Sequence, residues 1–161
     1  MQLNANHTPK GVNTDTAHAK RFHFSCEIGG DCLGTMIERV VETAKKTGHY
    51  GPTILGNTHL VLAEVVNNIA EHGYGHSDQG NIEITLELSE NEITIETTDF
   101  GVPMPNEKLP IAVLPDRHVP YDTLPEGGFG WYLIHTLAPG PIYTRLGNAN
   151  ILKFVIPESA P

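Results

Sequence analysis

Residues Thr58–Tyr74, THLVLAEVVNNIAEHGY, predict one amphipathic helix around which the other segments are arranged. Apolar side chains cover most of its circumference, whereas an ordinary surface helix has an apolar stripe of about half or less. We therefore expect a largely buried helix with a narrow polar stripe. At a helical rotation of about 100° per residue, one arc holds Leu60, Glu64, Asn67, Asn68 and Glu71.

Glu64 and Asn68 are the chemically interesting pair in this stripe. They are four residues apart, so their side chains are neighbours on one face of the helix. A buried polar group without a partner costs about 1–3 kcal/mol, so these groups need something to bind. A carboxylate beside an amide oxygen suits a hydrated or phosphate-bound Mg²⁺. The alternative is that the stripe is simply the solvated side of a core helix.

The composition is that of one globular domain. The chain has 161 residues, of which 39% are hydrophobic and 18% are charged, which is enough for one sizeable core. A formal net charge of −9 argues against nonspecific binding to nucleic acid or to acidic membranes. It leaves room for a basic protein partner, or for ligands held by backbone amides and metal.

The N-terminal segment, the absence of a long apolar run and the two cysteines indicate the cellular location. Residues 1–20 are polar and predict a poorly ordered tail, without the apolar centre of a signal peptide. No run approaches the roughly 18 apolar residues of a membrane span. Cys26 and Cys32 have no zinc-binding pattern around them, so we expect two reduced thiols in a reducing compartment. Together these features predict a cytoplasmic protein.

The periodicity along the chain predicts an α+β fold with an antiparallel or mixed sheet and helices on one face. Residues 50–57, with two glycines and a proline, read as a connection before the long helix. The other predicted elements are a strand at 21–28, a helix at 32–46, a hairpin over 81–99 with its turn at 89–91, a short helix at 129–138 and a last hairpin over 141–156.

The parity of the central hairpin singles out Asp99. Ile93 and Ile95 line the buried face of the second strand, and Asp99 continues the same row. The sequence therefore predicts a carboxylate that points inward at the end of a strand, which makes it a site candidate.

Two glycine-containing motifs flank a long irregular segment. The first is Asp99-Phe100-Gly101-Val102-Pro103, and the second is Gly127-Gly128-Phe129-Gly130 at the start of a helix. Residues 101–128, which include this segment, contain six prolines, and a loop of this length is usually a functional lid or disordered.

Each motif has a chemical interpretation. An inward Asp can accept a hydrogen bond from an exocyclic amine, while Gly101 lets a flat ring lie close. Glycines before a helix let backbone N–H groups approach a phosphate at the helix N-terminus. Taken singly, the first motif could be a turn and the second a flexible loop; all three in this order, on these elements, are far more specific.

The three motifs resemble those of the GHKL ATPase superfamily, whose nucleotide-binding domain has the Bergerat fold. Within it, the chain is similar to the small anti-sigma factors with serine-kinase activity, of the RsbW and SpoIIAB type. EVVNNIAEHGY, DFGVP and GGFGWYLI carry the resemblance, which covers about residues 20–157. It implies a two-layer α+β sandwich with a mixed, mostly antiparallel sheet, helices on one face and an ATP lid. It also implies one ATP-binding domain over 21–157, with tails at 1–20 and 158–161.

The resemblance implies a role for each matched residue. Glu64 would be the general base, and Asn68 would link Mg²⁺ to the phosphates of ATP or ADP. Asp99 would bind the adenine amino group and Gly101 would line the base. Gly128 and Gly130 would lie next to the phosphates.

The resemblance further implies a homodimer that holds a sigma factor or another regulatory protein and phosphorylates a serine of a small anti-anti-sigma (STAS-like) antagonist. Two departures are visible: Phe129 stands where many relatives have Arg or Lys, and Trp131 replaces a small aliphatic residue. The alternatives are therefore a nucleotide-dependent partner switch without kinase activity, or a sensor-type phosphotransfer domain without its dimerisation helices.

Overall fold

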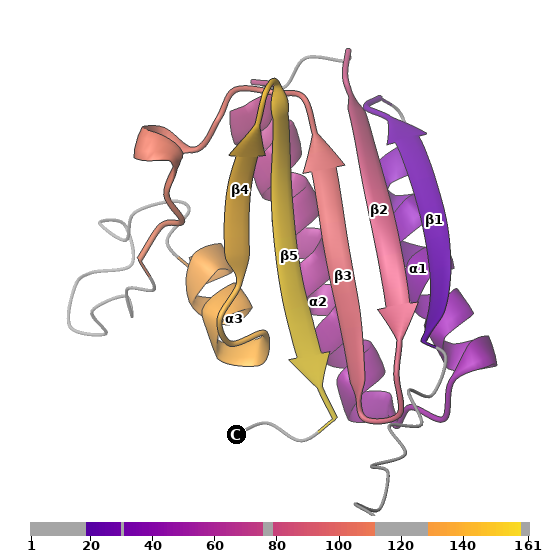
Figure 1. Cartoon of the computed structure of the whole chain (residues 1–161). Helices are drawn as coiled ribbons and strands as arrows, with labels where there is room; N and C mark the ends of the chain where they lie inside the picture. The colour runs from indigo at the N-terminus through magenta and orange to yellow at the C-terminus, as the bar shows by residue number, and fades with distance from the viewer. Residues whose placement is uncertain (1–18, 30, 76–78, 112–128, 159–161) are drawn as a thin grey trace, which may run out of the picture.

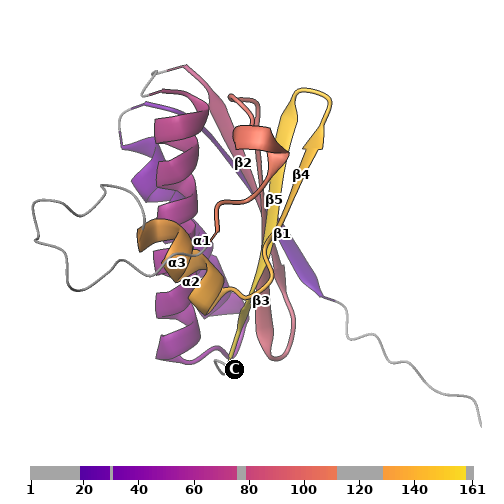
Figure 2. The ribbon, with the colours of Figure 1, turned by 90° about the vertical axis from the view of Figure 1, so that its left-hand side faces the viewer.

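Five antiparallel strands form one sheet in the order β1-β2-β3-β5-β4, and the helices pack against one of its faces (Figures 1 and 2). This computed structural model describes residues 19–29, 31–75, 79–111 and 129–158. The strands are β1 Lys20–Glu27, β2 Asn81–Leu88, β3 Glu92–Asp99, β4 Ile142–Leu146 and β5 Ala149–Pro157. The helices are α1 Cys32–Thr47, α2 Pro52–Asn68, the π-helical turn η1 Ile69–Gly73, the 3₁₀ turn η2 Pro105–Glu107 and α3 Phe129–Leu137.

The two-layer α+β prediction is confirmed. Every strand pair among the described residues is antiparallel, which is the simpler of the two predicted sheet types. A tight hairpin connects β4 to β5. Because β5 pairs with β3, and β4 pairs with the other edge of β5, this hairpin extends the sheet beyond β3. The predicted lid is described as far as residue 111; residues 112–128 lie outside the described part of the chain.

Helix α2 begins earlier than predicted. The prediction of a connection at 50–57 is wrong for the part from Pro52 onward, which forms the first turns of α2. Ile54 is 1% exposed and lies one turn before the buried Thr58, so the apolar face of the long helix simply continues backward. Pro52 suits the first turn of a helix, where its missing N–H is not needed. Gly51 and Pro52 thus mark a helix start.

The C-terminal end of the organising helix widens into a π-helical turn. The predicted helix continues through Gly73, but over Ile69–Gly73 its hydrogen bonds span five residues, as in the bond from Tyr74 N to Ile69 O (3.2 Å). Such turns occur frequently at functional sites. Here the turn carries His72 and Gly73 to the end of β3.

The helix-covered face of the sheet is apolar except at one end. Alternate residues of β2, β3 and β5 point into the core, as in the pattern of β2 and β3, where every second residue is buried. The strand register aligns four inward residues across the sheet: Cys26, Ile82, Asp99 and Asn150. Asp99 and Asn150 are each 5% exposed. The predicted inward orientation of Asp99 is therefore confirmed.

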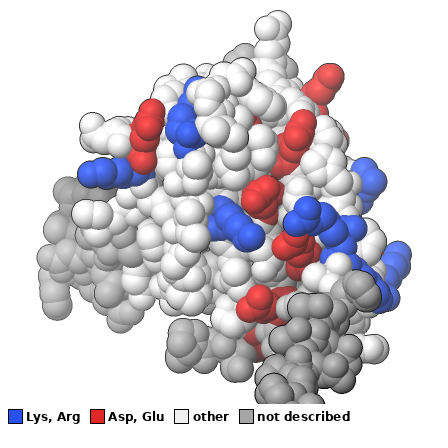
Figure 3. Space-filling view, in the orientation of Figure 1, with Lys and Arg blue, Asp and Glu red and all other residues white. Residues whose placement is uncertain are grey.

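The opposite face of the sheet carries charges of both signs. Figure 3 shows Lys, Arg, Asp and Glu side chains interspersed over this face. Arg21 of β1 pairs with Glu87 of β2, and Glu96 of β3 lies opposite Lys153 of β5. The alternation of polar and buried residues is that of an antiparallel sheet with one wet face.

A disulfide joins Cys26, the last inward residue of β1, to Cys32, the first residue of α1. The expectation of two reduced thiols is wrong for this structure. The chain reverses after β1, which brings the two Cα atoms to 6.1 Å, within the range that a disulfide bridges. The sequence spacing did not reveal this reversal. Among the described residues, no helix is long and apolar enough to cross a membrane.

Candidate functional site

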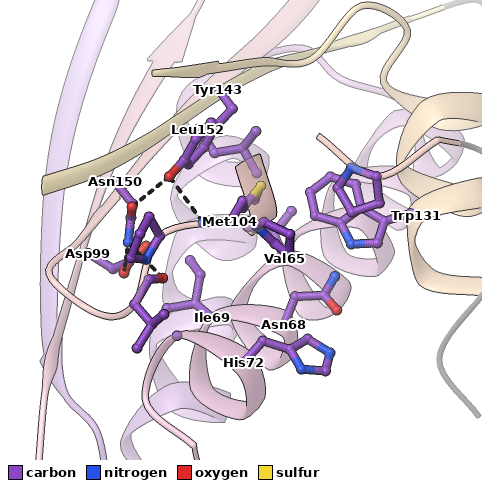
Figure 4. Close-up of a pocket in the computed structure, with 15 residues that line it drawn as sticks. Val65, Asn68, Ile69, His72, Asp99, Met104, Trp131, Tyr143, Asn150 and Leu152 are labelled. Carbon is purple, nitrogen blue, oxygen red and sulfur yellow. Dashed lines mark hydrogen bonds between the residues drawn. The ribbon is translucent and has the colours of Figure 1, made fainter. Parts of the chain in front are cut away.

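A cavity of about 470 Å³ opens where the ends of β3 and β5 meet α2, η1 and α3 (Figure 4). Its walls are largely apolar, with Val65 and Ile69 on the helix side and Leu152 on the sheet side. The segment after β3, with Met104, and the first turn of α3, with Trp131, close it from two further directions. A mainly apolar cavity with few polar groups is typical of a small-molecule site.

Asp99 supplies the carboxylate in this cavity. Among the described residues, hydrogen bonds to it are made at Oδ1, from Asn150 Nδ2 at 2.8 Å and from the backbone N–H of Gly101 at 2.9 Å. Burial raises the pKa of Asp99, while the two hydrogen bonds and the charge of Arg145 act in the opposite direction. A carboxylate with one oxygen held by protein donors can present its other oxygen to a ligand.

Asn150 was missed in the sequence, although its strand parity could have revealed it. It occupies the inward end of the β5 row that continues with Leu152 and Phe154, as Asp99 does in β3. Its Oδ1 accepts hydrogen bonds from Tyr143 OH (2.7 Å) and Arg145 Nη1 (2.6 Å). Polar residues at the ends of two inward rows were the available signal, but the pairing of β3 with β5 decides that they meet.

Asn68 and His72 line the cavity from the α2–η1 side, one turn apart (Figure 4). Asn68 Nδ2 is buried and has no hydrogen-bond partner within the described residues. A buried amide without a partner is costly, and such a group in a binding site is commonly satisfied by a ligand. His72 lines the cavity next to it.

Glu64 lies one turn before Asn68, against the start of α3. A Cβ built at Gly130 would lie 2.5 Å from Glu64 Oε2 and 3.8 Å from Asn68 Nδ2. The first and third sequence motifs are therefore in contact. Glu64 is half-buried and stands beside the described wall of the cavity rather than within it.

Gly101 lies just after β3 and packs against Gly73 of η1, next to the cavity. A Cβ at this position would come within 2.5 Å of the carbonyl oxygen of Gly73, so only glycine fits between β3 and η1. The adjacent Val102 N–H donates to the same oxygen at 2.7 Å. In the described structure Gly73, not Gly101, lines the cavity. Gly128, predicted to lie next to the phosphates, falls outside the described residues.

Comparison with known proteins decides the family. The model of the histidine kinase-like ATPase domain matches residues 33–156, which contain all three motifs and the cavity. The chain belongs to the histidine kinase-like ATPase family. The predicted membership of the GHKL group is thereby confirmed.

The curated relatives of this histidine kinase-like ATPase domain include serine-protein kinases RsbW. Those of Bacillus thuringiensis (strain Al Hakam) and Bacillus cereus (strain AH820) are each 39% identical over 79 residues, or 48% of this chain and 49% of theirs. The aligned part thus spans about half the length of these relatives.

Solved structures that match this one include histidine kinase domains. That of the Erythrobacter litoralis EL346 blue-light activated histidine kinase is 17% identical, with a TM-score of 0.46, over 78% of this chain and 60% of its own. The catalytic domain of histidine kinase ThkA is 16% identical, with a TM-score of 0.46, over 86% and 96%.

The two departures noted in the sequence have different structural consequences in this histidine kinase-like ATPase domain. Phe129, at the position where a basic residue was expected, is 51% exposed at the start of α3. Trp131 is buried and lines the cavity, with its ring 6.1 Å from that of His135. His135 in turn hydrogen-bonds the carbonyl oxygen of Pro110 (3.0 Å), which ties the segment after η2 to α3.

Proposed function

We propose that this domain binds ATP and ADP with Mg²⁺ in the cavity and transfers phosphate to a serine of a small antagonist protein. The observation that carries the nucleotide proposal is the buried Asp99 carboxylate at one end of an apolar cavity that Asn68 also lines, with Glu64 one turn before Asn68 on the same helix. A flat base would pack between the apolar walls, and its amine would donate a hydrogen bond to Asp99.

Each part of the nucleotide would have its own partner in the chain. Asp99 would accept a hydrogen bond from the adenine amino group. Asn68 would turn its amide oxygen to Mg²⁺, and the remaining ligands would be phosphate oxygens and water, as Mg²⁺ prefers. The partnerless amide of Asn68 supports this role, since a carboxamide can present either atom. The metal would neutralise charge on the phosphates. Gly128 and Gly130 would lie beside the phosphates.

The kinase step is proposed from the family and from Glu64. Relatives named serine-protein kinase RsbW support a serine-directed reaction, in which the half-buried Glu64, one turn before Asn68, would accept the hydroxyl proton. Phosphoryl transfer depends mainly on positioning and on charge neutralisation, which Glu64, Asn68 and the start of α3 would supply.

The oligomeric state and the protein partners are also proposed from the resemblance to the family. We propose one domain over 21–157 that forms a homodimer, holds a sigma factor or another regulatory protein, and releases it when a STAS-like antagonist competes. A cytoplasmic location would suit this role.

The nucleotide proposal is tested by calorimetric titration of ATP and ADP, with and without Mg²⁺, on the wild type and on Asp99→Asn. Glu96→Gln is the matched control, because it makes the same change on the same strand but on the opposite face of the sheet. We expect Mg²⁺-dependent binding that Asp99→Asn loses and Glu96→Gln keeps. Absence of binding to the wild type would refute the proposal.

A second candidate function is a partner switch that binds nucleotide without transferring phosphate. The exposed Phe129, in place of a basic residue beside the phosphates, favours it. Glu64→Ala separates the two functions: loss of phosphate transfer to a STAS-like protein with unchanged ATP affinity supports the kinase. A wild type that binds ATP but phosphorylates no such protein supports the switch.

A further inference from the structure

Asn150 stands directly opposite Asp99 in the β3–β5 register, and both side chains are buried. The Nδ2 group of Asn150 donates to Asp99 Oδ1 at 2.8 Å and to the carbonyl oxygen of Gly101 at 3.2 Å. The same amide therefore contacts the carboxylate and the backbone that follows it. Figure 4 shows Asp99 and Asn150 together on the sheet side of the cavity.

The orientation of the Asn150 amide is determined by two donors from β4. Tyr143 OH and Arg145 Nη1 both point at Asn150 Oδ1, at 2.7 and 2.6 Å. Only the oxygen of a carboxamide can accept two such bonds, so the nitrogen must face Asp99. Tyr143 is itself held, because its hydroxyl accepts the backbone N–H of Met104 at 3.2 Å.

With Oδ1 held by Asn150 Nδ2 and the Gly101 N–H, Asp99 can accept a hydrogen bond from a ligand at its other carboxylate oxygen. Burial raises its pKa, whereas the Asn150 donor, the Gly101 N–H and the positive charge of Arg145 favour the ionised form. Among the described residues that line the cavity, the other titratable ones are His72 of η1 and Tyr143 of β4. An ionised carboxylate accepts hydrogen bonds but cannot donate one.

We propose that Asn150, held by Tyr143 and Arg145, is a positioning residue that keeps Asp99 a fixed acceptor and thereby makes the cavity select a base with an exocyclic amine over one with a carbonyl. The inference rests on the proposed nucleotide function and names its selectivity. A site built to pair with an amine rejects a carbonyl strongly, because two acceptors then face each other without a proton.

The test compares ATP and GTP affinity by calorimetry, with Mg²⁺, between pH 5.5 and 8.5. Asn150→Asp keeps the shape of the side chain but replaces the donor facing Asp99 by a second carboxyl. Asn148→Asp makes the same chemical change in the exposed β4–β5 turn and is the control. Tyr143→Phe removes one of the two donors that orient Asn150.

We expect Asn150→Asp to weaken ATP binding at pH 7.5 by about 10- to 100-fold and GTP binding much less, so the ATP preference shrinks. Two carboxyls in contact share a proton up to higher pH, so the pH below which ATP affinity is lost should move upward. Tyr143→Phe should change both quantities in the same direction by a smaller factor, and Asn148→Asp should match the wild type.

Two outcomes would overturn the positioning role. One is an Asn150→Asp protein with the ATP/GTP ratio and pH profile of Asn148→Asp. The other comes from carbon-13 NMR titration of the Asp99 carboxyl in the ligand-free protein, if its pKa is the same in Tyr143→Phe as in the wild type. If the wild type binds neither nucleotide, the proposed function fails, and this titration still decides the role of Asn150. If Asn150→Asp does not fold, Tyr143→Phe decides it.

Discussion

Gly130 and Glu64 are in such close contact that a Cβ on Gly130 would lie 2.5 Å from the Glu64 carboxylate oxygen. The contact joins the start of α3 to the polar stripe of α2. Because the crowded atom is the end of a flexible side chain, an added methyl group can be accommodated if Glu64 moves away.

Gly130→Ala should therefore separate catalysis from folding. We expect the thermal midpoint to stay within a few degrees of the wild type, since Ala is favourable in a helix. Phosphate transfer should fall by at least about 10-fold, because a general base must remain within hydrogen-bond reach of its proton. The measurements are ATP turnover and thermal unfolding. Unchanged turnover would mean that the position of Glu64 has no role in the reaction.

Gly101→Ala should destabilise the domain strongly, because its methyl group would meet backbone rather than a movable side chain. The nearest atom would be the Gly73 carbonyl oxygen at 2.5 Å, which also accepts the Val102 N–H. We expect a loss of about 2–4 kcal/mol in denaturant unfolding, of the size that overpacking produces. The control is Gly56→Ala in α2, where a Cβ meets nothing within 4 Å and should stabilise by about 1 kcal/mol.

Asp99→Asn should raise stability at neutral pH while abolishing nucleotide binding. Burial raises the pKa of Asp99 above its ordinary value of 3.8, so the folded state holds the proton more tightly than the unfolded state. The stabilisation that comes from this tighter proton binding is complete below the pKa of Asp99 in the unfolded state. It is lost as the pH rises through the pKa of Asp99 in the folded state. The gain from Asp99→Asn should therefore be largest at pH 7.5 and shrink on acidification toward pH 3.8, as urea unfolding at several pH values would measure. A gain independent of pH would contradict this origin.

Thr97→Val should stabilise the protein by about 1 kcal/mol. The Thr97 hydroxyl is buried in the β3 row between Ile95 and Asp99 and has no hydrogen-bond partner among the described residues. Val has nearly the same shape without the unsatisfied group, and it is equally suited to a strand. Thr98→Val, on the opposite face, should change stability by no more than about 0.5 kcal/mol. Destabilisation by Thr97→Val in urea unfolding would show that the hydroxyl is satisfied in solution.

Opening the Cys26–Cys32 disulfide should lower the thermal midpoint of the protein. The bond closes a short loop between β1 and α1, and the loss of chain entropy in the unfolded state is worth about 2 kcal/mol. Thiol counting before and after reduction identifies the two states. Cys32→Ser should reproduce the reduced wild type and should not respond to reductant. Two free thiols in protein purified without reductant would contradict the bond.

Short-range patterns in the sequence were enough to predict the local elements and the direction in which their side chains point. The period of two in β3 placed Asp99 on the buried face, and the period of 3.6 in α2 placed Glu64 and Asn68 side by side. These predictions succeeded because alternation and helical rotation are properties of neighbouring residues. The glycine motifs indicated the family for a related reason, since close backbone approach restricts the residue type at single positions.

The contacts between residues far apart in the chain could not be predicted, because they depend on how the elements pack. Asn150 contacts Asp99 because β5 pairs with β3, a choice between strands far apart in the chain that no local period encodes. Gly130 reaches Glu64 because α3 packs on α2, and Cys26 reaches Cys32 because the chain reverses after β1. Helix α2 begins at Pro52 because Ile54 is buried in the core. The free energy gained by packing this side chain outweighs the weak local preference of residues 52–57 for a loop.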